Sequence, residues 1–161
     1  SIDLGDVLLG GIRGAKTARA VQDNLFRVAT ENGVALADEA VGIICRTRLE
    51  EAKSVEAAFE VEEQLKRELK RENLGPAAAT AVVTRAASLL NRNFDKGDDV
   101  MLLKVNYLRS IVEAQIVNDE LLDVDVLHVL SVIKGYGILG KTDEMTSFFN
   151  ALREKAPSIV E

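Results

Sequence analysis

A glycine-rich stretch between two apolar segments constrains the fold of this chain more than any other feature. Three glycines lie between residues 135 and 140, directly after an apolar run that ends at Ile133. Apolar side chains then recur at helical spacing, and a proline follows them: Met145, Phe148, Phe149, Leu152 and then Pro157. The pattern is typical of a helix, a tight turn and a second helix, whose expected N-cap is Thr142 or Asp143.

The same stretch also satisfies the phosphate-loop pattern G-x-x-x-x-G-K-[ST], through Gly135, Gly140, Lys141 and Thr142. In that motif backbone N–H groups wrap a phosphate, the lysine adds charge and the hydroxyl holds magnesium. The loop must follow a strand, and a further strand with a metal-binding carboxylate must come later. Only 19 residues, 143–161, follow Thr142, and no parallel-strand pattern is evident upstream. Because the strands that the motif needs are not evident, a P-loop nucleotide-binding protein that uses residues 135–142 is only an alternative, which depends on the pattern match.

The composition favours an all-α protein with a real core. Apolar residues make up 47% of the 161 residues, and the chain has only two prolines and few aromatic side chains. The first helix is expected to run without a break to about Thr30. No stretch approaches about 18 consecutive apolar residues, so no membrane span is expected.

We expect about seven helices, mostly paired as antiparallel hairpins and stacked as a short α-solenoid. Ser54 is expected to cap a helix that reaches Asn73, and Pro76 is expected to open the next one. The expected architecture is a single domain over residues 1–161. Three hairpins are expected over about 6–51, 76–118 and 122–155, and one additional helix over 54–73.

The charge balance argues against a nucleic-acid partner. The net charge is −6, whereas a nucleic-acid-binding domain normally shows a basic face. The most basic cluster is interleaved with acidic residues and has no aromatic side chain nearby: Lys66, Arg67, Lys70 and Arg71. We expect this cluster to be part of a solvated helix face.

Residues that could perform catalysis or bind a metal are not grouped in the sequence. His128 is the only histidine, Cys45 is the only cysteine, and no nucleophile elbow is present. A single cysteine permits no internal disulfide, which fits a reducing compartment. Because its neighbours are apolar, Cys45 is expected to be a small buried hydrophobe. We expect no catalytic residue, no metal site and no cofactor.

Several residues of the glycine-rich stretch match one helical-repeat pattern: Ile133, Gly135-Tyr136, Gly140-Lys141, Asp143-Glu144, Phe149 and Leu152. On these residues the stretch resembles a pentatricopeptide repeat, a helix hairpin of about 35 residues. The chain departs from the family at Met145, where the family has alanine, and at Val132, where it has leucine. The resemblance implies that Lys141 is an ordinary turn residue.

Proteins that carry pentatricopeptide repeats usually bind single-stranded RNA. They read bases with a polar residue three positions before the one that matches Ile133, and here that position is Leu130. An apolar side chain cannot hydrogen-bond to a base edge. We therefore expect a protein-binding role, and an organellar RNA-binding protein is the first alternative.

In size, helical makeup and repeat remnant, the chain is also similar to small accessory subunits of mitochondrial F1-ATP synthase. That resemblance implies docking on the α subunits of the catalytic head, without catalysis by this chain. It also implies a mitochondrial location, and without it a cytoplasmic location is expected. The leading hypothesis is therefore a non-catalytic protein-binding subunit of a larger mitochondrial assembly.

Overall fold

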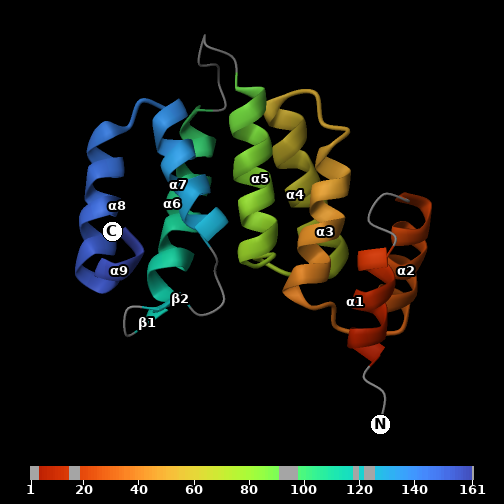
Figure 1. Cartoon of the computed structure of the whole chain (residues 1–161). Helices are drawn as coiled ribbons and strands as arrows, with labels where there is room; N and C mark the ends of the chain where they lie inside the picture. Colours follow the sequence, from red (N-terminus) through yellow and green to blue (C-terminus); the bar gives the residue numbers. More distant parts are fainter. Residues whose placement is uncertain (1–3, 15–18, 91–97, 118–119, 122–125, 161) are drawn as a thin grey trace. The chain divides into compact units, whose positions relative to one another are not determined.

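The computed structural model describes residues 4–14, 19–90, 98–117, 120–121 and 126–160 (Figure 1). Within these ranges nine helices and one two-stranded ladder are present: α1 Leu4–Gly14, α2 Arg19–Glu31, α3 Asp38–Leu49, α4 Val55–Leu69, α5 Pro76–Leu89, α6 Asp98–Ala114, β1 Ile116–Val117, β2 Glu120–Leu121, α7 Val126–Ile138, α8 Thr142–Lys155 and α9 Pro157–Val160. The expected all-α class is confirmed. None of the described helices is both long and apolar enough to cross a membrane.

The chain divides into two compact units, residues 1–82 and residues 83–161, and the boundary falls inside α5. We call them unit 1 and unit 2. The expected hairpin over 76–118 takes residues from both units. The single domain over 1–161 and the three hairpin boundaries therefore stay predictions.

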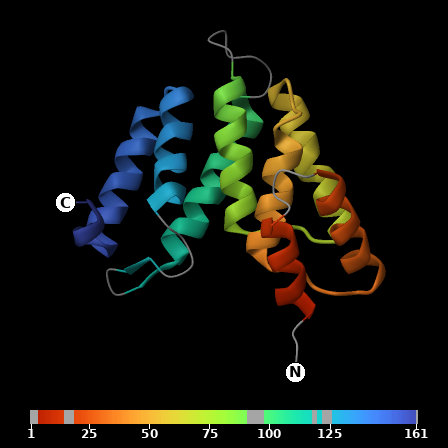
Figure 2. The ribbon, with the colours of Figure 1, turned by 45° about the vertical axis from the view of Figure 1, so that its right-hand side comes forward.

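Unit 1 is built from α1 to α4 and the first half of α5. α1 packs on both α2 and α3, and α3 packs on α4 (Figure 2). Gly42 allows α3 to approach the start of α5, because a Cβ at this position would lie 2.6 Å from the Cβ of Ala77. The buried side chains come from every helix of the unit: Ile12, Phe26, Val41, Ile44, Leu65 and Val82 among others.

Two expectations about unit 1 are wrong. The first helix does not run unbroken to Thr30, because α1 ends at Gly14 and α2 begins at Arg19. The helix over 54–73 ends at Leu69, because Lys70 takes the left-handed conformation and closes it. The expected cap at Ser54 is confirmed, since its hydroxyl accepts a hydrogen bond from the Ala57 N–H at 3.1 Å.

Unit 2 is built from the second half of α5 and from α6 to α9. α6 packs on α7, α7 packs on α8, and α9 folds back on α8. Tyr136 lies at the centre of this packing, and its hydroxyl donates a hydrogen bond to Asn106 Oδ1 at 2.6 Å. The expected hairpin over about 76–118 implies a second helix that reaches residue 118. Instead α6 ends at Ala114, and the ladder of β1 and β2, which the sequence did not indicate, follows it.

Candidate functional site

The phosphate-loop residues lie at the joint between α7 and α8. Gly135 is buried inside α7, Gly140 has a φ of 67°, Lys141 is the N-cap of α8 and Thr142 is its first residue. The expected N-cap, Thr142 or Asp143, is therefore wrong by one or two positions. The reason is that the left-handed Gly140 ends α7 so abruptly that the next helix starts at once.

The backbone N–H groups of this joint are already used. Gly140 N donates to Gly137 O at 3.1 Å, and Lys141 N donates to Tyr136 O at 2.9 Å. These two bonds are the pair that closes a helix with glycine in the left-handed conformation. A phosphate loop needs such N–H groups to be free, and it needs a strand before the first glycine, where this chain has α7.

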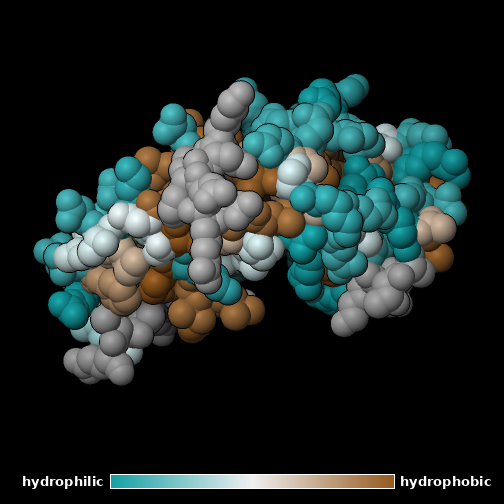
Figure 3. Space-filling model, turned by 90° about the horizontal axis from the view of Figure 1, so that it is seen from above, coloured by the Kyte–Doolittle hydropathy of each residue, from teal (hydrophilic) through white to brown (hydrophobic). Residues whose placement is uncertain are grey.

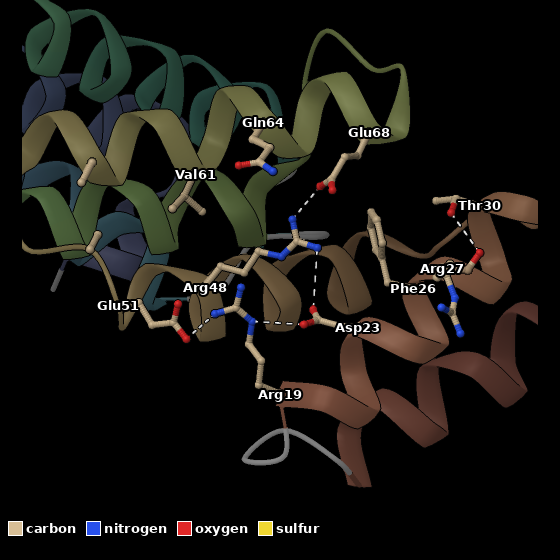
Figure 4. Close-up of a pocket in the computed structure, with 12 residues that line it drawn as sticks. Arg19, Asp23, Phe26, Arg27, Thr30, Arg48, Glu51, Val61, Gln64 and Glu68 are labelled. Atoms are coloured by element: carbon tan, nitrogen blue, oxygen red, sulfur yellow. Dashed lines mark hydrogen bonds and ion pairs between the residues drawn. The ribbon is translucent and has the colours of Figure 1, made fainter.

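A cleft of about 710 Å³ lies in unit 1, between α2 and α4 (Figure 4). The α2 wall is formed by Arg19, Asp23, Phe26, Arg27 and Thr30, and the α4 wall by Ala57, Val61, Gln64 and Glu68. The end of α3 and the turn after it supply the floor: Arg48, Glu51 and Ala52.

A chain of five charged side chains crosses the cleft, with the signs alternating. Arg19 pairs with Glu51 and, at 3.4 Å, with Asp23. Asp23 is also 3.8 Å from Arg48, whose other nitrogen lies 2.6 Å from Glu68. The hydrogen bond to Glu51 raises the pKa of Arg19. The chain links α2, α3, the turn after α3, and α4.

Arg48 is the central member of this chain. Only 13% of its side chain is exposed, and its guanidinium carbon lies 5.0 Å from the centre of the Phe26 ring. Cation–π contacts of this kind favour arginine and strengthen when water is excluded. Arg48 therefore acts as a fixed part of the cleft floor.

Arg27 differs from the other two arginines of the cleft. Its exposed guanidinium donates to Asn24 Oδ1 at 3.3 Å, and no carboxylate pairs with it among the described residues. The three acidic residues of the lining pair with Arg19 and Arg48 instead. With three arginines and three carboxylates in its lining, the cleft carries no net charge.

A second candidate surface lies in unit 2, on the side of α6 that faces away from the core. Val100, Leu103 and Tyr107 are spaced three and four residues apart, so they share one face of α6. All three are exposed, and Leu103 is 68% exposed. We call these three residues the α6 stripe. The core side of the same helix carries Met101, Val105, Leu108 and Val112.

The outer face of α7 is apolar as well. Leu127 and Leu130, spaced by three residues, are both exposed, and Leu130 is the position that the pentatricopeptide family uses to read bases. Figure 3 shows hydrophobic patches among hydrophilic side chains over α6 to α8. Contiguous exposed apolar surface is typical of protein contacts, membrane contacts and ligand-binding grooves.

The basic cluster of α4 and the turn after it is tied to acidic residues. Lys66 lies 3.3 Å from Glu63, Arg67 lies 2.8 Å from Glu60, and Arg71 lies 3.0 Å from Asp38. Lys70 is the residue that closes α4. Paired cations are poorly placed to neutralise phosphates.

Cys45 is fully buried on α3, which confirms the expected small hydrophobe. Burial raises the pKa of its thiol to about 12. Because the thiolate is the reactive form, we expect iodoacetamide to modify the folded protein on the order of 1,000-fold more slowly than the urea-unfolded protein. Intact-mass spectrometry from neutral to mildly alkaline pH measures this difference. Equal rates in the two states would show that Cys45 is accessible.

Within the described residues, no three His, Cys, Asp or Glu side chains are placed to share a metal ion. Comparison of the chain with protein-family models, with curated proteins and with solved structures gave no match. The surfaces of the chain itself, and the resemblance within residues 127–155, are therefore the features that indicate what it binds.

Proposed function

We propose that this chain is a non-catalytic accessory subunit that binds other proteins in a larger mitochondrial assembly. The α6 stripe carries the proposal. A helix that buries one apolar face in its own core and exposes a second one has surface left for a partner. Exposed leucine and tyrosine side chains at helical spacing suit a helical or flat protein surface better than a nucleic acid.

The specific form of the proposal is the small pentatricopeptide-like extra subunit of euglenozoan mitochondrial F1-ATP synthase. The helical hairpin of α7 and α8, which contains the repeat remnant, supports it. The partner would be the α subunit of the catalytic head, and this chain would contribute binding without chemistry of its own. The apolar Leu130 supports a protein partner over RNA, because it cannot hydrogen-bond to a base.

Gentle native purification tests this proposal, with identification of the proteins that accompany the chain. We expect F1 α subunits in the purified material. We expect Leu103→Asp to weaken the association by at least about tenfold, because burying an unpaired charge at an interface costs more than about 1.4 kcal/mol. Val28→Asp is the matched control, since Val28 is an exposed valine on α2 outside the stripe. Gel filtration and interferometry measure the Kd of each variant and of the unaltered chain, and the ratio of these Kd values gives the weakening.

Two outcomes would replace the proposal with an alternative. Recovery as a free monomer that binds nucleotide, with loss of binding in Lys141→Ala, would favour the phosphate loop. Salt-dependent RNA binding that weakens when the basic cluster is neutralised would favour the RNA-binding alternative: Lys66, Arg67, Lys70 and Arg71.

A further inference from the structure

α2 is held in unit 1 on two sides that differ in chemistry. On one side it packs on α1, where a Cβ placed on Gly11 would lie 3.0 Å from Cδ1 of Leu25. On the other side the cleft separates it from α4, and within the described residues its backbone approaches α3 and α4 at few points. Phe26 is the only large apolar side chain among the buried residues of α2. Apolar packing therefore holds α2 mainly on α1.

Arg48, at the end of α3, makes the main link across the cleft. Its guanidinium lies 2.6 Å from Glu68 of α4 and 3.8 Å from Asp23 of α2 (Figure 4). The same guanidinium carbon lies 5.0 Å from the centre of the Phe26 ring, which also belongs to α2. One side chain on the floor of the cleft therefore contacts α2 twice and α4 once.

Arg19 of α2 makes a second link, through its ion pair with Glu51 in the turn after α3. The side chain of Glu51 is 69% exposed and that of Arg19 is 38% exposed. Ion pairs at such exposed positions contribute little and are screened by salt, whereas the partly buried Arg48 is screened less. Arg48 therefore holds α2 more firmly than Arg19 does, and both links weaken as the ionic strength rises.

From this arrangement we propose that α2 is a flap that opens away from α4, with α1 as its hinge and the contacts of Arg48 as its latch. Loss of these contacts lets α2 swing outward while it stays packed on α1. Opening exposes the ring of Phe26, which is only 6% exposed in the closed form. The flap belongs to unit 1 alone, so it does not depend on the proposed function or on the identity of a partner.

The width of the cleft at low and high salt tests the flap in the full chain. Thr30 and Gln64 are exposed residues of the α2 wall and the α4 wall, and Thr30→Cys with Gln64→Cys accepts a spin label on each. Cys45 is buried and should stay unlabelled. By double electron–electron resonance, we expect the fraction of molecules with a longer distance to rise at least about threefold between about 0.05 M and about 1 M NaCl.

Arg48→Gln tests the latch at constant salt, in the same doubly labelled chain. We expect it to raise the open fraction at least about threefold at about 0.05 M NaCl and to reduce the further effect of salt, because the main charge that salt screens is gone. Arg46→Gln is the matched control, because Arg46 is an exposed arginine of the same helix outside the cleft lining. Circular dichroism establishes that each variant is folded before its distances are measured.

A second labelled pair separates opening of the flap from loosening of the whole unit. Arg46→Cys with Gln64→Cys spans α3 and α4, which pack on each other, so this pair should keep one distance at both salt concentrations. Equal lengthening of both pairs would overturn the proposal. An unchanged distance between positions 30 and 64 at high salt would overturn it too, since α2 would then be held by packing. The salt series keeps Arg48 in place, so it decides the matter even if Arg48→Gln does not fold.

Discussion

Replacement of Phe148 by alanine is expected to lower the free energy of unfolding by about 3–5 kcal/mol. Phe148 is fully buried among the helices of unit 2. Its ring also lies 5.6 Å from the guanidinium carbon of Arg109, so the variant loses a cation–π contact together with the packing. Because α8 has few other large buried side chains, we expect the loss to affect the whole of unit 2.

Phe149 provides the matched control, since it is the same residue type one position further along α8. It is only partly buried, so Phe149→Ala is expected to cost about 1 kcal/mol. Urea unfolding followed by circular dichroism gives both values. Equal losses would mean that α8 is rotated about its axis relative to the structure, and that the position matched to the pentatricopeptide pattern is as buried as its neighbour.

The α8 example shows what apolar spacing can predict. Helical spacing predicts both Phe148 and Phe149 on the inward side of α8. Only the contacts with other helices determine that Phe148 is the more deeply buried of the two. α6 is the favourable case. Apolar spacing predicts six inward residues, and all of them except Leu102 are buried: Met101, Leu102, Val105, Leu108, Val112 and Ile116. That helix lies against α7 along much of its length, so its apolar period and its core face coincide.

α2 is the unfavourable case. Continuing the period of α1 predicts Val21, Leu25 and Val28 on the inward side, whereas the structure buries Gln22, Phe26 and Ala29. Val21 and Val28 are 47% and 46% exposed. α1 ends at Gly14 and α2 begins at Arg19, so the apolar period of α1 does not continue into α2. A shift of one residue turns a helix by about 100° and changes its buried face.

The same shift explains why the sequence did not reveal the cleft. Phe26 was not part of the expected inward stripe, so the partners around it could not be inferred. Arg19, Arg48 and Glu68 come from three different helices, and no sequence spacing relates them. The cleft exists only because α2 and α4 flank the end of α3.

The second large effect is expected at Gly135, the first glycine of the phosphate-loop pattern. A Cβ at this position would lie 2.6 Å from Cγ2 of Val105 and 3.4 Å from Cγ1 of Val83. Val105 is fully buried and β-branched, and a β-branched side chain in a helix strongly prefers one χ1 rotamer, so moving it away is costly. Although alanine favours a helix by about 1 kcal/mol over glycine, overpacking here is expected to outweigh this gain.

Gly135→Ala should therefore lower the free energy of unfolding by about 2 kcal/mol, whereas Gly137→Ala should raise it by about 0.5–1 kcal/mol. Gly137 is the matched control because it lies in the same helix, and its Cβ would meet only Met145 Cε, at 3.6 Å. Urea unfolding of the two variants gives both signs. If Gly135→Ala left stability unchanged and removed nucleotide binding, Gly135 would be part of a phosphate-binding site. A loss of stability would instead mean that Gly135 allows α7 to pack closely against its neighbours.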